Sequence, residues 1–278
     1  MNMVSKTIVL TGASDGIGAA AARKLTADGH RLVLVGRSKA KTTAIADELG
    51  ADYYLADFAE LASVRALAAT LLERYPRIDV LANNAGGIFA KERALTVDGH
   101  EMTFQVNYLA PFLLTDLLID RLIESKATVI NTSSVAHQRY GDLKIDDLDA
   151  ARSYQATKAY GNAKLAQVLY TKELVRHFGS QGVSAVSFHP GNIATNFSNE
   201  AATPFRMVYA TALRHFLGSP EKGADTLVWL CEGTPNKDWT PGEYYVKRKP
   251  HRTNKQVGDT ALAAQLWERS TQMLATAG

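Results

Sequence analysis

Tyr160 and Lys164 are the residues of this chain whose types and spacing could move a proton. They stand four positions apart in a run that predicts a helix, 156–178, so their side chains share one helix face, one turn apart. A phenol has an ordinary pKa of about 10, and a neighbouring ammonium lowers that pKa. The pair could therefore work as a general acid and base, but the same spacing also arises by chance and needs support from the rest of the chain.

Tyr154 and Lys158 form a second pair with the same spacing. The six positions from Tyr154 to Tyr160 correspond to about 240° of helix rotation, so the two phenols cannot both face one ligand. Spacing alone leaves both pairs open.

The composition is typical of a globular chain with one α/β domain or two small ones: 278 residues, 46% hydrophobic and 21% charged. The net charge of +3 is small, and no block of Lys and Arg indicates a nucleic-acid surface. The first residues lack the apolar region of a signal peptide, and no apolar run is long enough to span a bilayer. We therefore expect a cytoplasmic protein without a membrane segment.

The cysteine and histidine content argues against a metal site. The single cysteine, Cys231, excludes an internal disulfide and a Cys-rich metal site. It lies in an apolar helical run, which predicts a buried and inert thiol. The histidines include no pair at helical ligand spacing, so we expect no metal.

The chain opens with a predicted strand, 7–10, followed by a glycine-rich turn and an Ala-rich helix that runs to about residue 28. Strand, turn and helix in this order form the phosphate-binding start of a doubly wound sheet. Glycines let the backbone approach a pyrophosphate, whose charge is met by N–H groups at the helix N-terminus. The candidate cofactor-binding residues of this turn are Gly12, Ser14, Asp15, Gly16, Ile17 and Gly18.

The end of the second predicted strand, 31–35, indicates which nicotinamide cofactor the chain prefers. In such folds a carboxylate at this position holds the ribose 2′-hydroxyl, whereas a nearby Arg suits a 2′-phosphate. Here no carboxylate follows the strand, and Arg37 is succeeded by Ser38, Lys39 and Lys41. This pattern favours NADP(H) and leaves NAD(H) as the alternative. The cations could also be solvated charges at the start of a helix.

Strand and helix patterns alternate along the rest of the chain. Further strands are predicted near 53–56, 78–82, 128–132, 183–188 and 243–246. Helices are predicted near 39–49, 61–75, 97–123, 156–178, 221–231 and 259–274. This alternation indicates an α/β fold: a single-domain, Rossmann-type, doubly wound parallel sheet flanked by helices on both faces. No linker divides residues 1–278. We expect cofactor binding mainly in 6–135, and catalysis and substrate binding in 136–278.

A set of short motifs follows the strands in a fixed order. In sequence they are Thr11-Gly12-x-x-x-Gly16-Ile17-Gly18, Asp57, Asn83-Asn84-Ala85-Gly86, Asn107, Ser133-Ser134, Tyr160-x-x-x-Lys164 and His189-Pro190-Gly191-x-x-x-Thr195. Each motif alone is weak, but the ordered set resembles the short-chain dehydrogenase/reductase superfamily over nearly the whole chain. The glycine spacing is similar to that of its compact branch.

Three segments resemble most closely the retinol dehydrogenase-like and protochlorophyllide reductase-like members: 131–137, 159–166 and 169–174. The long interval between Ser134 and Tyr160 also fits that group. The resemblance implies NADP(H) and a lipophilic carbonyl or alcohol substrate. One departure is Ala163, where Ser is frequent, and it bears on the identity of the substrate more than on activity.

The resemblance assigns roles to four catalytic residues. Leu165 and Ala166, which follow Lys164, match the family, whereas the residues after Lys158 do not, so the proton transfer is assigned to Tyr160. Tyr154 is then expected to be a surface or helix-start residue beside the substrate entry. Tyr160 would give or take the proton, and Lys164 would lower the pKa of Tyr160 and hold the nicotinamide ribose. Ser134 would donate a hydrogen bond to the carbonyl oxygen. Its neighbour Ser133 is the rival, because strand alternation sends the two side chains to opposite faces. Asn107 would hold a water that links Lys164 to solvent, or else its side chain satisfies helix backbone.

The resemblance also extends the set of cofactor-binding residues. Asn83, Ala85 and Gly86 are expected on the adenosine and ribose side, and Asp57 at the adenine amino group, unless Asp57 caps the next helix. His137 and His189 are expected to be structural. The remaining cofactor-binding candidates are Phe58, Asn84, Pro190, Gly191, Ile193 and Thr195, the last at the nicotinamide carboxamide.

The stretch 196–217 carries several aromatic and Met residues and is predicted to form a lid over a bulky apolar substrate, or an amphipathic helix that packs on the body. The sequence thus indicates an NADP(H)-dependent oxidoreductase that transfers a hydride between nicotinamide and a carbonyl or alcohol of a lipophilic, ring-containing substrate. The alternatives are a non-catalytic NADP(H) sensor or scaffold, and a carbon–carbon double-bond reductase. Family members commonly form dimers or tetramers, whereas the added segment 142–152 leaves a monomer open.

Overall fold

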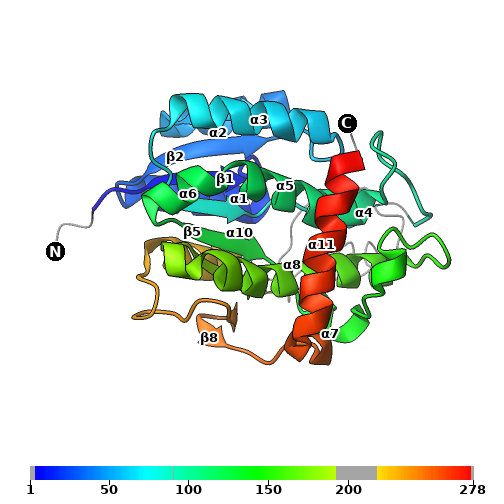
Figure 1. The fold of residues 1–278 in the computed structure, drawn as a ribbon. Coiled ribbons are helices and arrows are strands. Elements are labelled where there is room, and N and C mark those ends of the chain that lie inside the picture. Colours follow the sequence, from blue (N-terminus) through cyan, green and yellow to red (C-terminus); the bar gives the residue numbers. More distant parts are fainter. Residues whose placement is uncertain (1–3, 90, 192–217, 277–278) are drawn as a thin grey trace.

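A sheet of eight strands runs through the centre of the molecule (Figure 1). The computed structural model describes residues 4–89, 91–191 and 218–276. The strands are β1 (Thr7–Thr11), β2 (Arg31–Gly36), β3 (Asp52–Leu55), β4 (Val80–Asn83), β5 (Thr128–Thr132), β6 (Ser184–His189), β7 (Tyr244–Val246) and β8 (Lys249–Pro250). Their order in the sheet is β3-β2-β1-β4-β5-β6-β7-β8, which contains the 3-2-1-4-5-6 order of dinucleotide-binding folds.

Helices cover both faces of this sheet. The helices of the described residues are α1 (Gly16–Ala27), α2 (Lys39–Leu49), α3 (Leu61–Arg74), α4 (Met102–Phe104), α5 (Ala110–Leu117), α6 (Ile119–Ser125), α7 (Ala136–Tyr140), α8 (Ala156–Phe178), α10 (Pro220–Glu232) and α11 (Thr260–Thr276). Side-chain chemistry starts several of them. Asp15 caps α1 by accepting a hydrogen bond from the Gly16 N–H, and Ser219 caps α10 directly before Pro220.

Alternation along the strands builds two hydrophobic cores. Val9, Val33 and Val129 point to the face covered by α3, α5, α6, α8 and α11. Ile8 and Ile130 point to the other face, against α1, α2 and α10. Because successive strand residues face opposite sides and both sides are covered, the strands read as near-continuous apolar runs. The predicted doubly wound fold is confirmed, and the single thiol, Cys231, is fully buried in α10 as predicted.

The short last strand, β8, was not predicted from the sequence, and it is the antiparallel strand of the sheet. The strands β1 to β7 pair in parallel, but β8 pairs antiparallel with β7 through Tyr245 and Pro250. A tight turn joins the two strands, with Lys247 and Arg248 at positive φ. A short turn can join only antiparallel neighbours, since a parallel partner needs a long crossover.

The prediction of a single continuous helix over 97–123 is wrong. The helical residues begin at Met102, where the Glu101 carboxylate accepts hydrogen bonds from the N–H groups of Thr103 and Phe104 at 2.9 and 2.7 Å. A π-helical turn, Gln105–Leu109, then leads into α5, and the chain bends by 63° at Leu118 before α6. Among the described helices, none is long and apolar enough by itself to cross a membrane; only this bent pair, taken together, meets that test.

Candidate active site

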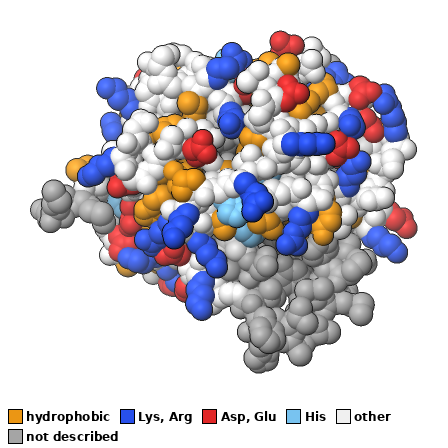
Figure 2. Space-filling view, turned by 90° about the horizontal axis from the view of Figure 1, so that it is seen from below, with side chains coloured by type: hydrophobic (Ala, Val, Ile, Leu, Met, Phe, Trp, Pro, Cys, Tyr) orange, Lys and Arg blue, Asp and Glu red, His pale blue; other side chains and the backbone are white. Residues whose placement is uncertain are grey.

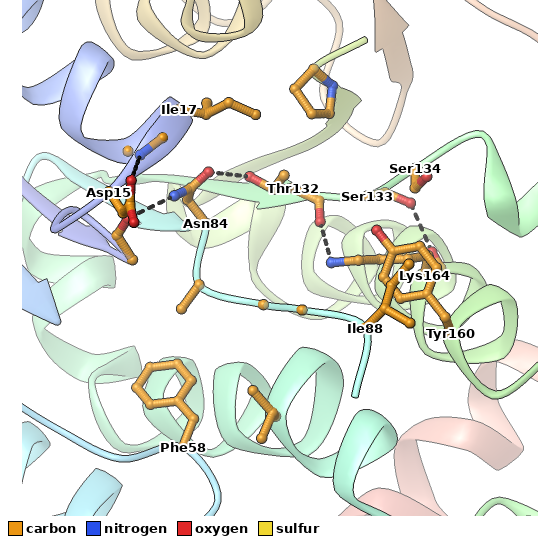
Figure 3. Close-up of a pocket in the computed structure, with 18 of the residues that line it drawn as sticks. Asp15, Ile17, Phe58, Asn84, Ile88, Thr132, Ser133, Ser134, Tyr160 and Lys164 are labelled. Atoms are coloured by element: carbon orange, nitrogen blue, oxygen red, sulfur yellow. Dashed lines mark hydrogen bonds between the residues drawn. The ribbon is translucent and has the colours of Figure 1, made fainter. Parts of the chain in front are cut away.

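A cavity of about 570 Å³ lies at the carboxyl ends of the central strands, where doubly wound sheets bind ligands. Figure 3 shows Asp15 and Ile17 at one end and Ser134, Tyr160 and Lys164 at the other. Both the 6–135 and 136–278 parts of the chain contribute to its walls. With the exceptions of Asn83 and Asn107, every predicted site residue that the structure describes lines this cavity.

The glycine turn fits the pyrophosphate of a dinucleotide. Gly12 adopts φ +66°, and a Cβ there would lie 2.8 Å from the Ala85 Cα. A Cβ on Gly18 would lie 2.0 Å from the Gly12 carbonyl oxygen. Neither position therefore tolerates a side chain. As a result, no side chain at these positions covers the backbone N–H groups at the start of α1. The N–H groups and dipole of that terminus suit a phosphate.

Thr11 ties the loop after β4 to this turn. Its Oγ1 accepts hydrogen bonds from the N–H groups of Asn84 and Ala85, both at 3.0 Å, while Asn84 Nδ2 donates to the Thr11 carbonyl at 3.0 Å. The prediction that Asn83 lines the cavity is wrong. Asn83 is fully buried and donates to Asn131, because it is still a strand residue whose side chain points away from the cavity.

Cations gather at the end of the cavity beside β2. Arg37, Ser38 and Lys41 line it, whereas Lys39 does not. Lys41 Nζ lies 2.6 Å from the Asp15 carboxylate, so one of these cations already carries an anionic neighbour within the protein. No carboxylate stands directly after β2, in agreement with the sequence.

Asp57 lines the same end and does not cap the next helix. Its Oδ1 accepts a hydrogen bond from the Ala59 N–H at 2.9 Å in a local turn, and the helix α3 has Glu60 at its N-cap. The capping alternative for Asp57 is therefore wrong. Phe58 lies across the cavity from Thr132 and Ser133 (Figure 3), where an apolar ring can flank a bound base.

Lys164 is buried with its ammonium inside the site. Its Nζ donates hydrogen bonds to the Thr132 carbonyl at 2.8 Å and to Gln167 Oε1 at 3.1 Å, and it lies 5.6 Å from the centroid of the Tyr160 ring. Burial lowers the pKa of Lys164 to about 7. The Lys164 side chain can therefore hold or release a proton near neutral pH.

The two serines after β5 have different surroundings. Ser133 is buried, and its Oγ donates a hydrogen bond of 2.8 Å to the Lys164 carbonyl oxygen. Ser134 Oγ accepts from the Ala136 N–H at 3.2 Å, and its hydroxyl faces the cavity beside Tyr160 (Figure 3). Both serines line the cavity, but the hydroxyl proton of Ser133 is engaged with α8, so Ser134 is the better placed of the two to donate to a ligand.

Asn107 sits in the π-helical turn, an irregularity that often marks functional sites. Its side chain is fully buried and makes two hydrogen bonds to the loop after β4: Nδ2 donates to the Gly87 carbonyl, and Oδ1 accepts from the Gly87 N–H. Nδ2 also donates to the Thr103 carbonyl at 2.8 Å, so the alternative role of satisfying helix backbone is present. A Cβ on Gly86 would lie 2.5 Å from Asn107 Oδ1 and 3.3 Å from Lys164 Nζ, which places both side chains against Gly86.

The second Tyr/Lys pair stays outside the cavity. Tyr154 precedes α8, whose N-cap is Gln155, and burial together with the nearby Glu101 carboxylate raises the pKa of Tyr154. Lys158 is largely exposed and lies 3.6 Å from the Asp142 carboxylate. The assignment of Tyr160 to the site and of Tyr154 to the start of the helix agrees with these positions.

A search for similar proteins places this architecture in a known family. The sequence profile described as short chain dehydrogenase matches residues 6–204. The chain belongs to the short-chain dehydrogenase/reductase family. It is therefore an oxidoreductase of the class that acts on alcohol and carbonyl groups, and the resemblance seen in its motifs is confirmed.

Relatives of this short-chain dehydrogenase/reductase include enzymes named for ketone and retinoid chemistry. A Streptomyces sp. (strain C5) protein named for daunorubicin C-13 ketoreductase activity, DnrU, is 42% identical over 95% of this chain and 91% of its own. Human retinol dehydrogenase 14 is 33% identical over 98% of this chain and 87% of its own. Human retinol dehydrogenase 13 is 34% identical over 97% and 84%.

Solved structures show the same fold. A crystal structure of an uncharacterised Mycobacterium paratuberculosis protein aligns with a TM-score of 0.78 and 29% identity, covering 98% of this chain and 96% of the other. The NADP complex of Pseudomonas aeruginosa RhlG aligns with a TM-score of 0.68 and 25% identity, covering 87% and 95%. Short-chain dehydrogenases/reductases bind NAD(H) or NADP(H), so a nicotinamide cofactor is expected in the cavity described above.

The nicotinamide end of the site is described only in part. Pro190 and Gly191 line the cavity after β6, with Gly191 at φ +97°. Ile193, Thr195 and the predicted lid over 196–217 lie outside the described residues. His137 and His189 are buried, and burial lowers the pKa of each to about 4, so both imidazoles are neutral near pH 7, consistent with structural roles.

Several residues of the site were missed by the sequence analysis. Helix α7 begins two residues after Ser134, at Ala136, which packs on Tyr160 and Ile88. It approaches α8 at Gly161, where a Cβ would lie 2.7 Å from the Tyr140 Cβ. The glycine directly after Tyr160 was the available signal for this close contact. Gln167 lies three positions after Lys164 and therefore on the same helix face, so its spacing could have indicated that its side chain accepts a hydrogen bond from the Lys164 ammonium.

Proposed function

We propose that this enzyme is NADP(H)-dependent and transfers a hydride between nicotinamide and the carbonyl or alcohol group of a lipophilic, ring-containing substrate. The observation that carries the proposal is the meeting of Tyr160, Lys164 and Ser134 at one end of a cavity whose other end begins at a phosphate-type glycine turn. A protein that only senses or binds the cofactor needs the glycine turn but has no use for a proton relay.

In the proposed mechanism the side chains manage the proton and the charge on oxygen. When bound, NADPH supplies the hydride. Ser134 Oγ donates a hydrogen bond to the substrate oxygen, where negative charge develops. The Tyr160 hydroxyl donates the proton, and the Lys164 ammonium, 5.6 Å from the Tyr160 ring, favours the phenolate that remains. The reverse reaction uses Tyr160 as the base.

The proton that Tyr160 gives must be replaced from solvent. A Lys164 pKa of about 7 suits this role, since the amine can pass on and regain a proton at neutral pH. Asn107 would hold a water between Lys164 and solvent. In support of this, Asn107 and Lys164 both pack against Gly86.

The preference for NADP(H) over NAD(H) rests on Arg37. This guanidinium, with Ser38 and Lys41, lines the end of the cavity where a 2′-phosphate would lie, and no carboxylate follows β2 to hold a free 2′-hydroxyl. Asp57 and Phe58 would hold the adenine, while Asn84, Ala85 and Gly86 would face the adenosine and ribose. Pro190 and Gly191 would flank the nicotinamide.

The proposed substrate class rests on the apolar walls near Tyr160 and on the names of the relatives. Ile88, Phe89, Val135 and Tyr140 line the cavity around the catalytic end. Burying a ring system against such side chains contributes roughly 25 cal/mol per Å² of apolar surface. The relatives named for daunorubicin and retinol concern large apolar or polycyclic molecules.

The test is the oxidation of NADPH and of NADH in the presence of a panel of aryl ketones, aldehydes and quinones. We expect turnover of at least one ring-containing compound and a higher kcat/KM for NADPH than for NADH. Arg37→Ala should raise the KM for NADPH at least about tenfold and change the KM for NADH much less, because a charge-assisted contact is lost only with NADPH. Equal effects on both cofactors, or a wild-type preference for NADH, would contradict the assignment of Arg37.

A further inference from the structure

Arg139 lines the cavity at the end opposite to Arg37. Arg37 follows β2, and Arg139 lies on α7, directly after β5. The strands β1 and β4 separate β2 from β5, so three inter-strand steps of about 4.8 Å put the two ends roughly 14 Å apart. The cavity is thus cationic at both ends. Arg37 serves the proposed cofactor phosphate, and Arg139 is left for the substrate.

The position of Arg139 on α7 places it just beyond the catalytic tyrosine. Ala136, three residues earlier on the same helix face, packs against Tyr160 and Ile88. A rise of 1.5 Å per residue puts Arg139 about 4.5 Å farther along the helix axis than Ala136. The guanidinium can therefore reach the part of a substrate that projects outward from the carbonyl.

Helix α7 is held in place by the segment after β8. Gln138 Nε2 donates a hydrogen bond to the Arg252 carbonyl oxygen, and Asn254 Nδ2 donates to the carbonyl oxygens of His137 and Gly141 at 2.9 and 2.8 Å. The backbone that carries Arg139 is therefore fixed before a ligand arrives. Such preorganisation lowers the cost of ordering a binding group.

The surroundings of Arg139 are positive. Arg139 is exposed, and within the described part of the chain no carboxylate oxygen lies within 4 Å of its guanidinium. The exposed Lys and Arg residues of the neighbouring β7–β8 region are Lys247, Arg248, Lys249, Arg252 and Lys255, of which Arg248 pairs with Asp225. Figure 2 shows Lys and Arg side chains grouped around a histidine on the face that carries β8 and α7.

The positive charge of Arg139 reaches the catalytic end of the site. His189, which also lines the cavity, has a pKa of about 4, lowered first by burial and, among smaller causes, by the charge of Arg139. An electrostatic potential of this sign attracts an anion to the mouth of the cavity.

We propose that Arg139 binds a carboxylate of the substrate, so that the natural substrate is an amphiphilic ketone or aldehyde with its anion beyond the ring system. This inference rests on the proposed reductase function. A guanidinium forms short, bidentate hydrogen bonds with a carboxylate, and the apolar walls around Tyr160 would enclose the ring. A neutral lipophilic substrate would leave the Arg139 guanidinium without a role at this position.

The test compares 4-benzoylbenzoate with its methyl ester, two aryl ketones that differ in one negative charge. The kcat/KM of each is measured with NADPH for the wild type, Arg139→Gln and Arg139→Lys. Arg74→Gln, which changes an exposed arginine on α3 away from the cavity, is the matched control. Direct binding of both compounds is measured by calorimetry in the presence of NADP⁺, which requires no turnover.

We expect the wild type to prefer the acid over the ester, and Arg139→Gln to lower that preference at least tenfold, mainly through KM. Arg139→Lys should restore part of it, added salt should weaken it, and Arg74→Gln should leave it unchanged. An equal effect of Arg139→Gln on both compounds, or a wild-type preference for the ester, overturns the inference. If the wild type reduces neither ketone, the proposed function fails for this class of substrate, and the binding data still decide the role of Arg139. Tighter binding of the acid that Arg139→Gln removes supports carboxylate binding by Arg139. Equal binding of the acid and the ester overturns it.

Discussion

Lys164 and Gln167 meet inside the protein, where Lys164 Nζ donates a hydrogen bond of 3.1 Å to Gln167 Oε1. The other acceptor of this ammonium is the Thr132 carbonyl, at 2.8 Å. Both acceptors are neutral, and burial lowers the pKa of Lys164 from its ordinary 10.5 to about 7. Burial therefore brings the pKa of Lys164, the proton relay of the proposed mechanism, close to neutral pH. Its hydrogen-bond partners are neutral dipoles, and neither is a carboxylate.

This arrangement predicts a pH-dependent stability that Lys164→Met removes. Between pH 7 and 10.5 the unfolded chain binds a proton on Lys164 that the folded protein has lost, so the free energy of unfolding rises with pH across this window. Below pH 7 both states carry the proton and the contribution is constant. Urea unfolding at pH 6.5 to 9 should show a steeper rise for the wild type than for Lys164→Met. Parallel pH curves for the two proteins would contradict the lowered pKa.

The two serines after β5 predict opposite phenotypes. Ser134→Ala should lower kcat/KM by about 10²-fold or more, because it removes a donor to the developing charge, with little effect on stability. Ser133→Ala should lower the free energy of unfolding by about 1 kcal/mol, because it removes the hydrogen bond to the Lys164 carbonyl, with a smaller loss of activity. Steady-state kinetics and urea unfolding of both variants separate the two roles. A large activity loss confined to Ser133→Ala would reverse the assignment.

At Gly161, replacing glycine with alanine should lower the stability of the protein, although helix propensity alone would raise it. Alanine is favoured over glycine in a helix interior by roughly 1 kcal/mol, yet a Cβ at position 161 would lie 2.7 Å from the Tyr140 Cβ. Gly161→Ala should therefore destabilise the protein by about 1–3 kcal/mol, as α7 is pushed away from α8. Gly258→Ala is the control, since a Cβ there meets nothing within 4 Å. A Gly161→Ala protein more stable than the wild type would show that α7 moves freely.

The fold could be predicted from the sequence where the pattern is local. The strands that begin at Thr7 and Arg31 are buried apolar runs, and the turn after Thr11 is marked by glycines that the backbone requires, so their order was enough to predict the sheet. Helix α8 spans Ala156–Phe178, as predicted, because the helical pattern on both sides of Gly161 is long enough to outweigh one glycine. The prediction of a continuous helix over 97–123 failed for two reasons. The start of the helix depends on the Glu101 carboxylate, and the break at Leu118 has no glycine or proline to mark it.

The candidate site could be predicted where residue types carry the chemistry, as with Tyr160 and Ser134. The contacts that position these residues depend on segments that are distant in sequence. Arg139 reaches the cavity because α7 is tied to Asn254, more than a hundred positions later, and no spacing rule reveals that. Asn83 was misassigned because a difference of one residue at a strand end reverses the direction of the side chain.

The central claim is that Tyr160 is the proton donor, and the most direct test compares Tyr160→Phe with Tyr154→Phe. Both changes remove one hydroxyl, and only Tyr160 lines the cavity. With NADPH and any ketone that the wild type reduces, Tyr160→Phe should lower kcat/KM at least about 10²-fold while NADPH binding persists, and Tyr154→Phe should remain within about threefold of the wild type. Full activity in Tyr160→Phe, or a loss confined to Tyr154→Phe, would contradict the account.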